Sequence, residues 1–234
     1  MTRHVPAFRI ISSVERHNSA SPLVALTYDD GPSEWTEPLL DVLRAGQAAA
    51  TFFVIGEAVD GREETLLRCA ADGHEVANHL FTHPRPDLIR DDQLEEEVAR
   101  TSDRIANVLG KAPTLLRTPY GLAEERVAPI AARHGMPTTV HWSVVSDDWR
   151  FATSAPIVKR VMREIHDGAV VSLHDGKPNS VTIRYPSRKP TVRATAEILA
   201  VLASDGYRFV TVSELIASEE IRASESGDDG TAEL

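Results

Sequence analysis

The sequence predicts a single α/β domain folded as a closed or nearly closed barrel of parallel strands. Seven short β-rich runs alternate with amphipathic, helix-like segments along the chain, which is the order that βαβ units produce. Several of these runs are continuously apolar, as strands buried on both faces are. The 234 residues contain no repeat or linker and fit the size of one α/β barrel. An open doubly wound sheet is the alternative.

The predicted strands are runs rich in β-branched and aromatic residues. In chain order they are 23–28 (LVALTY), 50–55 (ATFFVI), 74–78 (HEVAN), 114–117 (TLLR), 137–142 (PTTVHW), 169–173 (AVVSL) and 207–212 (YRFVTV).

The predicted helices lie between these runs. The clearest has apolar or small residues at spacings of three and four, with Asp91 as its expected cap and Gly110 as its stop. Its stripe consists of Leu94, Val98, Thr101, Ile105 and Val108. The other predicted helices are 37–45, 63–71, 124–134, 155–166 and 192–203.

The ends of the chain differ in composition from its middle. We expect residues 1–20 to form an N-terminal extension, 21–217 the domain, and 218–234 an acidic, disordered tail. The N-terminus has no apolar run of signal-peptide length, which predicts a cytoplasmic protein, although a trimmed form of a secreted protein would look the same.

Composition excludes several classes of partner. The formal net charge of −10 argues against nucleic acid, because phosphate binding needs a basic surface. No stretch approaches the ~20 apolar residues that span a membrane. Cys69 is the single cysteine, so no intrachain disulfide can form. The sequence leaves the oligomeric state open.

Polar residues follow the predicted strands one after another. In an α/β barrel, the carboxyl ends of the strands share one rim, where chemistry gathers. The residues that fall there are Asp29 and Asp30 (LTYDDGP), His79 and His83 (NHLFTHP), Arg117 and Tyr120 (LRTPYG), Trp142 and Trp149 (WSVVSDDW), and His174 and Asp175 (VVSLHDG).

Two of these histidines have the spacing of metal ligands. His79 and His83 are four residues apart, so both imidazoles can reach one ion, and Asp30 or Asp29 can supply a carboxylate from the neighbouring strand end. A metal held by two His and one Asp lowers the pKa of its water and polarises a carbonyl. The other aspartate and His174 are then the available base and acid.

Taken together, the five motifs TYDDGP, HLFTHP, RTPYG, SDDW and SLHDG resemble those of the polysaccharide deacetylase family (the NodB-homology domain, carbohydrate esterase family 4). The resemblance covers residues 23–215. It implies a distorted barrel of seven or eight βα units and a divalent ion held by Asp30, His79 and His83. That ion is usually Zn²⁺, with Co²⁺ or Ni²⁺ as alternatives.

The resemblance also implies catalytic roles. Asp29 is the implied general base, His174 the general acid, and Arg117 the partner that orients Asp29. The implied oxyanion donor is the backbone N–H of Tyr120, and Trp149 forms an apolar wall beside the acetyl methyl group.

Two positions depart from the family pattern. Leu80 stands where the family usually has Ser or Thr, so we expect looser support of the histidine loop but a retained metal. Val145 stands where the family usually has the aspartate that tunes the acid histidine. We therefore expect a lowered pKa of His174, unless Asp147, Asp148 or Asp175 substitutes.

Three further interpretations concern residues outside the motifs. Segment 175–190 is long and basic, and we expect Arg184 or Arg188 to contact the substrate, for instance an anionic group. The run 95–97 (EEE) is interpreted as a solvated helix face. His141 is interpreted as a core or pocket-wall residue.

The predicted function is that of a hydrolase acting on a non-peptide carbon–nitrogen bond. It would remove the N-acetyl group of an amino sugar in a glycan, oligosaccharide or glycoside. The alternatives are a non-catalytic glycan-binding module that retains the metal, an O-acetyl esterase, and an amidase acting on a non-sugar substrate.

Overall fold

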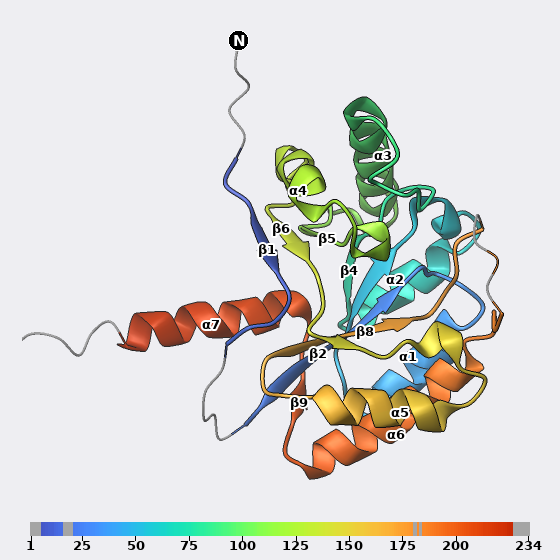
Figure 1. Ribbon diagram of the computed structural model, residues 1–234, viewed down its shortest axis with the longest axis vertical. Coiled ribbons are helices and arrows are strands. Elements are labelled where there is room, and N and C mark those ends of the chain that lie inside the picture. The colour runs from blue at the N-terminus through green and yellow to red at the C-terminus, as the bar shows by residue number, and fades with distance from the viewer. Residues whose placement is uncertain (1–5, 16–20, 180–181, 183, 227–234) are drawn as a thin grey trace, which may run out of the picture.

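The computed structural model describes residues 6–15, 21–179, 182 and 184–226, and their strands form one curled, parallel sheet (Figure 1). Among these residues the strand order is β1-β6-β5-β4-β3-β2-β8-β7, with β9 paired to the start of β2. The predicted fold class, a distorted α/β barrel in a single domain, is confirmed.

The strands are β1 (Arg9–Ile11), β2 (Leu23–Asp29), β3 (Thr51–Val54), β4 (Glu75–Asn78), β5 (Leu115–Leu116), β6 (Thr138–Val140), β7 (Val144–Val145), β8 (Ala169–His174) and β9 (Arg208–Phe209). The α-helices are α1 (Thr36–Ala45), α2 (Glu63–Ala71), α3 (Asp91–Leu109), α4 (Glu124–Arg133), α5 (Ser154–Glu164), α6 (Lys189–Ser204) and α7 (Val212–Ser226). Three short 3₁₀ turns are η1 (Gly56–Val59), η2 (Pro119–Gly121) and η3 (Asp148–Arg150).

Each predicted strand and helix is present, with ends shifted by a few residues. The expected cap of α3 is off by one position: Arg90 is the N-cap, its N–H donates to Gln93 Oε1 at 3.0 Å, and Asp91 already belongs to the helix. Gly110 does end α3, with a left-handed φ of 71°.

Both chain ends differ from the prediction within the described residues. Residues 9–11 of the expected extension form strand β1, which pairs with β6. Helix α7 continues to Ser226, so 218–226 are helical rather than part of a disordered tail, because Ala, Glu and Arg favour helix even in a polar segment. Residues 227–234 lie outside the described part of the chain.

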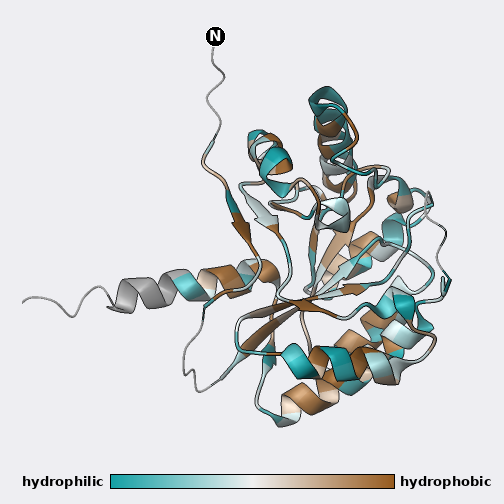
Figure 2. Ribbon diagram, in the orientation of Figure 1, coloured by the Kyte–Doolittle hydropathy of each residue, from teal (hydrophilic) through white to brown (hydrophobic). Residues whose placement is uncertain are grey.

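The alternation of side chains along β2 divides the core into two layers. Val24, Leu26 and Tyr28 point toward the helices, where they pack in the cluster that α1, α2, α5 and α6 cover. Leu23 and Ala25 belong to the other cluster, which occupies the barrel interior with residues from β3, β4, β6 and β8. Asp29 shares the parity of the inner residues. Figure 2 shows hydrophobic residues along the central strands, and both hydrophobic and hydrophilic residues on helices α5 and α6.

The barrel wall is completed by two unusual segments. The run from β6 to β7 pairs with β5 and β1 at its start and with β8 at its end. The N-terminal segment spans the same gap: Ile11 O accepts from His141 N–H at 2.6 Å, and Val14 N–H donates to Gly168 O at 3.0 Å. Val14 is itself buried.

A search of the described helices found none with the length and apolarity needed to cross a membrane.

Candidate metal centre and catalytic site

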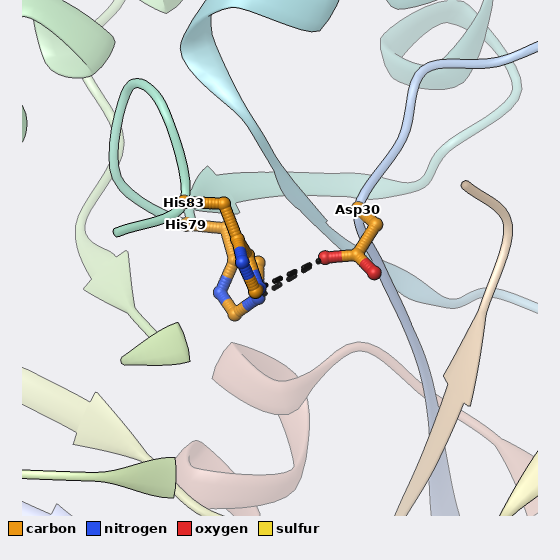
Figure 3. A group of neighbouring side chains, drawn as sticks. All are labelled: Asp30, His79 and His83. Carbon is orange, nitrogen blue, oxygen red and sulfur yellow. Dashed lines mark ion pairs between the residues drawn. The ribbon is translucent and has the colours of Figure 1, made fainter. Parts of the chain in front are cut away.

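Asp30, His79 and His83 converge at the carboxyl ends of β2 and β4 (Figure 3). Asp30 Oδ1 lies 3.5 Å from His79 Nε2 and 3.2 Å from His83 Nε2. One ligand atom from each residue lies within 4.8 Å of the others, and all three residues are buried. The structure therefore places together the three residues that the sequence analysis proposed as metal ligands.

The chemistry of this group fits a divalent metal ion. Asp30 Oδ1 and His83 Nδ1 are buried and make no hydrogen bond within the described residues. His79 Nδ1 lies 2.8 Å from the carbonyl of Arg117, which fixes this nitrogen as the donor and leaves Nε2 unprotonated. Burial and the neighbouring His79 lower the pKa of His83 to about 2, so its imidazole is neutral and its lone pair is free for a ligand bond.

Asp29 has different partners from its neighbour Asp30. Arg117, which is fully buried, donates from Nη1 to Asp29 Oδ1 at 2.8 Å and to Thr27 Oγ1 at 2.6 Å. Its remaining donors reach Val140 O at 3.1 Å and His141 O at 3.0 Å. The guanidinium is thus held from several sides, and it fixes the direction of the Asp29 carboxylate.

His174 has a carboxylate partner, Asp148. His174 Nδ1 lies 2.7 Å from Asp148 Oδ1, and Asp148 Oδ2 accepts from His174 N–H at 2.9 Å and from Thr191 Oγ1 at 2.7 Å. Burial opposes the charge on His174, but Asp148 outweighs it and raises the pKa of His174 to about 9.

The lowered pKa expected for His174 in the absence of a carboxylate partner is therefore not found, because one of the possible substitutes is present. Val145 does lack a carboxylate, but of the three candidate substitutes Asp148 takes its place. Asp147 instead pairs with Arg160 at 2.8 Å, and Asp175 accepts from Thr36 Oγ1 at 2.5 Å.

The loop that carries both histidines is held firmly despite Leu80. Glu97 Oε2 accepts from the backbone N–H groups of Phe81 at 2.8 Å and Thr82 at 2.7 Å, and Glu97 Oε1 accepts from Thr82 Oγ1 at 2.8 Å. Asn78 Oδ1 accepts from Leu80 N–H at 2.9 Å. The expected looser loop support is not found, because Leu80 packs fully buried in the cluster under α3 and α4 and a carboxylate replaces the missing hydroxyl.

Glu97 also corrects the interpretation of run 95–97 as solvated. Glu95 contacts Arg133 at 3.2 Å and Glu97 binds the histidine loop, while Glu96 remains exposed. Three consecutive glutamates on a helix give no sign of which one faces the protein interior. The sequence alone therefore does not distinguish Glu97 from its exposed neighbour Glu96.

One cavity of about 380 Å³ is lined by the proposed metal ligands together with Asp29 and His174. Its wall includes Asp29, Asp30, His79, His83, Tyr120, Trp142, Val145, Trp149, His174 and Arg188. Trp149 and Tyr120 are 41% and 45% exposed, which places their rings at the rim of the cavity. The Tyr120 backbone has a left-handed φ of 61°.

The two arginines of segment 175–190 line different hollows. Arg188 is 2% exposed, donates from Nε to Gly176 O at 2.7 Å, and lines the cavity. Its Nη1 finds no hydrogen-bond partner in the described chain. Arg184 lies over the Tyr185 ring at 5.4 Å and borders a separate hollow with Lys189 and Arg193. Residues 180, 181 and 183 lie outside the described residues.

His141 lies behind the cavity wall, against the wall residue Trp142. Its ring stacks on Trp142 at 4.0 Å between centroids, and its Nδ1 lies 2.7 Å from Glu124 Oε1. The same pair of rings closes over Gly121, where an added Cβ would meet both at 2.8 Å.

Comparison with known proteins gives one consistent result. Residues 16–139 match the sequence model of a family described as polysaccharide deacetylase. The chain is 37% identical over 225 residues to a chitooligosaccharide deacetylase from Bradyrhizobium sp. (strain ANU 289), covering 92% of this chain and 100% of that protein.

A second relative is longer than this chain. The chain is 33% identical over 193 residues to the peptidoglycan-N-acetylglucosamine deacetylase PgdA from Listeria monocytogenes serotype 1/2a (strain 10403S). The match covers 82% of this chain but 38% of that protein. Among solved structures, that of peptidoglycan deacetylase PdaC from Bacillus subtilis superposes with a TM-score of 0.76 and 33% identity, covering 88% of this chain and 96% of that one.

Proposed function

Because the chain belongs to the polysaccharide deacetylase family, we propose that it is a metal-dependent hydrolase that removes the N-acetyl group of an amino sugar in an oligosaccharide or glycan. One observation carries this proposal. The two adjacent aspartates have separate partners, Arg117 for Asp29 and the two histidines for Asp30, and a carboxylate-paired His174 lines the same cavity. A site for binding alone has no need of both a base and an acid.

In this proposal Asp30, His79 and His83 hold the ion, most simply Zn²⁺. When bound, such an ion lowers the pKa of water and polarises the acetyl carbonyl. Asp29 accepts the proton of the attacking water, and its pairing with buried Arg117 fixes its direction.

The leaving group needs a proton, and His174 supplies it. Asp148 holds the imidazole through Nδ1, so Nε2 is free to donate to the departing amine nitrogen. The backbone N–H of Tyr120 stabilises the developing oxyanion, and Trp149 bounds the acetyl methyl group. The C–N bond breaks, and the products are acetate and the free amino sugar.

Arg188 is the proposed substrate contact within the cavity, because it lines the cavity and its Nη1 has no hydrogen-bond partner among the described residues. Arg184 has no comparable support, since it borders a different hollow. The relative that this chain covers in full is a chitooligosaccharide deacetylase, so N-acetylglucosamine oligosaccharides are the first substrates to test.

Acetate release from N-acetylated sugars and oligosaccharides, before and after chelation and zinc restoration, tests the proposal. We expect release that disappears with chelator and returns with zinc. The Asp29→Asn variant should lose about 10²-fold or more of kcat, because general-base catalysis contributes about 10²–10⁴-fold. This variant should still bind zinc.

Three other outcomes would each indicate a different function. Bound zinc with glycan affinity but no acetate would indicate a binding module. Acetate from O-acetylated substrates alone would indicate an esterase, and acetate from simple non-sugar amides alone would indicate an amidase.

A further inference from the structure

The chain between η2 and α4 has an unusual backbone. Tyr120, Gly121 and Ala123 have left-handed φ angles of 61°, 63° and 55°. Glycine adopts this conformation without a steric penalty, whereas tyrosine and alanine do not, so Tyr120 and Ala123 are strained. Such strain persists only where surrounding contacts impose it, and it gathers at functional sites. We call residues 120–123 the η2–α4 segment.

This segment borders the metal cavity through Tyr120. The N–H of Tyr120 makes no hydrogen bond with any described residue, whereas the N–H of Gly121 donates to Thr118 O at 3.1 Å. The Tyr120 ring packs edge-on against His83, with 4.7 Å between centroids. The Tyr120 N–H is therefore available to a ligand, beside one of the proposed metal ligands.

Two rings from the chain after β6 cover the backbone of this segment. His141 and Trp142 stack with 17° between their planes, and a Cβ added at Gly121 would meet both rings at 2.8 Å. A hydrogen bond holds the other end of the segment: Oε1 of Glu124, the first residue of α4, accepts from His141 Nδ1 at 2.7 Å. The side chains of Glu124 and His141 are 17% and 31% exposed, so water competes only partly for this contact.

The backbone of His141 is itself fixed on both sides. His141 N–H donates to Ile11 O at 2.6 Å, and His141 O accepts from Arg117 Nη2 at 3.0 Å. Arg117 is fully buried and also donates to Asp29. The contact between His141 and Glu124 therefore joins the η2–α4 segment to the same buried guanidinium that fixes the Asp29 carboxylate.

We propose that Glu124 and His141 are positioning residues, whose contact fixes the η2–α4 segment and through it the Tyr120 N–H. This inference rests on the proposed function for the role of that N–H, which is to stabilise the oxyanion. Neither Glu124 nor His141 belongs to the described wall of the cavity, so we expect neither to touch the substrate. An oxyanion donor acts more strongly on the transition state than on the bound substrate, so a displaced N–H should lower kcat and leave KM nearly unchanged.

Rates of acetate release from the β-1,4-linked trisaccharide of N-acetylglucosamine, measured on zinc-loaded protein, give kcat and KM. Glu124→Ala should lower kcat about tenfold or more and leave KM within about twofold, since loss of a whole oxyanion donor costs about 10²–10³-fold in kcat. Glu124→Gln keeps a side-chain oxygen that can accept from His141 Nδ1, so it should recover most of the lost kcat.

The matched control is Glu125→Ala, which truncates the next glutamate in the first turn of α4. The Glu125 side chain is exposed and makes no hydrogen bond or ion pair with a described residue. Both alanine variants lose an acid from the N-terminus of the helix, but only Glu124→Ala loses the contact with His141. Glu125→Ala should therefore leave kcat and KM unchanged.

Hydrogen exchange of the backbone amides, followed by mass spectrometry without substrate, measures the η2–α4 segment directly. In zinc-loaded Glu124→Ala we expect faster exchange than in the wild type in peptides that cover residues 119–123. Peptides that cover β8 should exchange at the same rate in both proteins, because β8 lies in the central sheet.

The two readouts separate this inference from the proposed function. Unchanged exchange or unchanged kcat in Glu124→Ala would overturn the inference, as would equal losses of kcat in Glu124→Gln and Glu124→Ala. A raised KM at constant kcat would overturn it too, because the pair would then act on substrate binding. Faster exchange in Glu124→Ala with no acetate release by the wild type would refute the deacetylase proposal and leave the contact as the one that fixes the segment.

Discussion

Asp29 and Asp30 are adjacent in the chain but contact different sets of residues. Asp29 ends β2 on the inner face and meets Arg117, whereas Asp30 has left the strand, with a left-handed φ of 75°, and meets His79 and His83. This difference in partners follows from the sequence, because successive strand residues point in opposite directions. The partner of His174 is different: the sequence offers Asp147, Asp148 and Asp175 as candidates, and only the turn at η3 selects Asp148.

Asp148→Asn should move the alkaline limb of the pH–rate profile to lower pH. An acid must be protonated to act, so activity falls as pH rises through the pKa of His174, which Asp148 raises to about 9. Without the carboxylate that pKa falls, and activity is lost at lower pH. Asp147→Asn is the control, because Asp147 pairs with Arg160 instead. An alkaline limb at the same pH in Asp148→Asn would contradict the assignment.

Leu80→Ser, which introduces the residue type usual in the family, should destabilise this protein. Leu80 is fully buried against the cluster that contains Leu94 and Val98. Truncating a buried leucine costs about 2–5 kcal/mol, and an unpaired hydroxyl adds to that cost. Urea denaturation of the two proteins measures the difference. Unchanged stability would mean that the loop can repack around a hydroxyl.

At the scale of elements, helix α3 supports the proposed metal site although none of its residues is a proposed ligand. Its inward face supplies Glu97 to the loop and Val98 O to Asn78 Nδ2 at 2.9 Å. Outer partners of this kind orient ligands and change metal affinity about 10–100-fold when removed.

Zinc affinity should fall in the order wild type, Glu97→Gln, Glu97→Ala. Glutamine keeps one oxygen for the N–H groups of Phe81 and Thr82 but loses the charge, whereas alanine leaves both donors unpaired. We expect a loss of about tenfold or more for alanine. Chelator competition measures the affinity, and Glu96→Ala, which alters an exposed neighbour, is the control. If both Glu97 variants bound zinc like the wild type, α3 would have no such role.

The elements predicted from sequence are those whose own residues form an apolar run or a periodic apolar stripe. Strands such as β2 and β8 are continuous apolar runs, and α3 has a long stripe, so their own residues define them. Strands β1 and β7 have three and two residues, and they exist because β6 and β8 offer free edges. Such pairing depends on the whole fold and leaves no local pattern.

The molecule as a whole is an acidic barrel whose wall the N-terminal segment completes. Its net charge of −10 is spread over a surface that is interrupted by basic residues near segment 175–190. The segment around β1 and Val14 bridges β6 and the start of β8, so it contributes to the barrel rather than lying outside the domain.

Deleting residues 1–14 should lower the free energy of unfolding by about 2 kcal/mol or more, because it removes a paired strand and a buried valine. The lost contacts include Arg9 N–H to Pro137 O at 2.9 Å and Val14 N–H to Gly168 O at 3.0 Å. Thermal and urea denaturation measure the change. Deleting residues 1–5 alone removes none of these contacts and is the control; equal stability of the two truncated proteins would show that β1 is dispensable.

The closing position of β1 also has a consequence for synthesis on the ribosome. Arg9 reaches its partner Thr138 across 129 residues of chain. At about 5–20 residues per second, the N-terminal segment waits on the order of ten seconds for β6 to be made. During that interval the nascent chain exposes the interior face of β2 and the apolar residues around it. Strand β1, made long before its partner β6, is therefore among the last elements to find its place, and the unfinished barrel is the form that chaperones would meet.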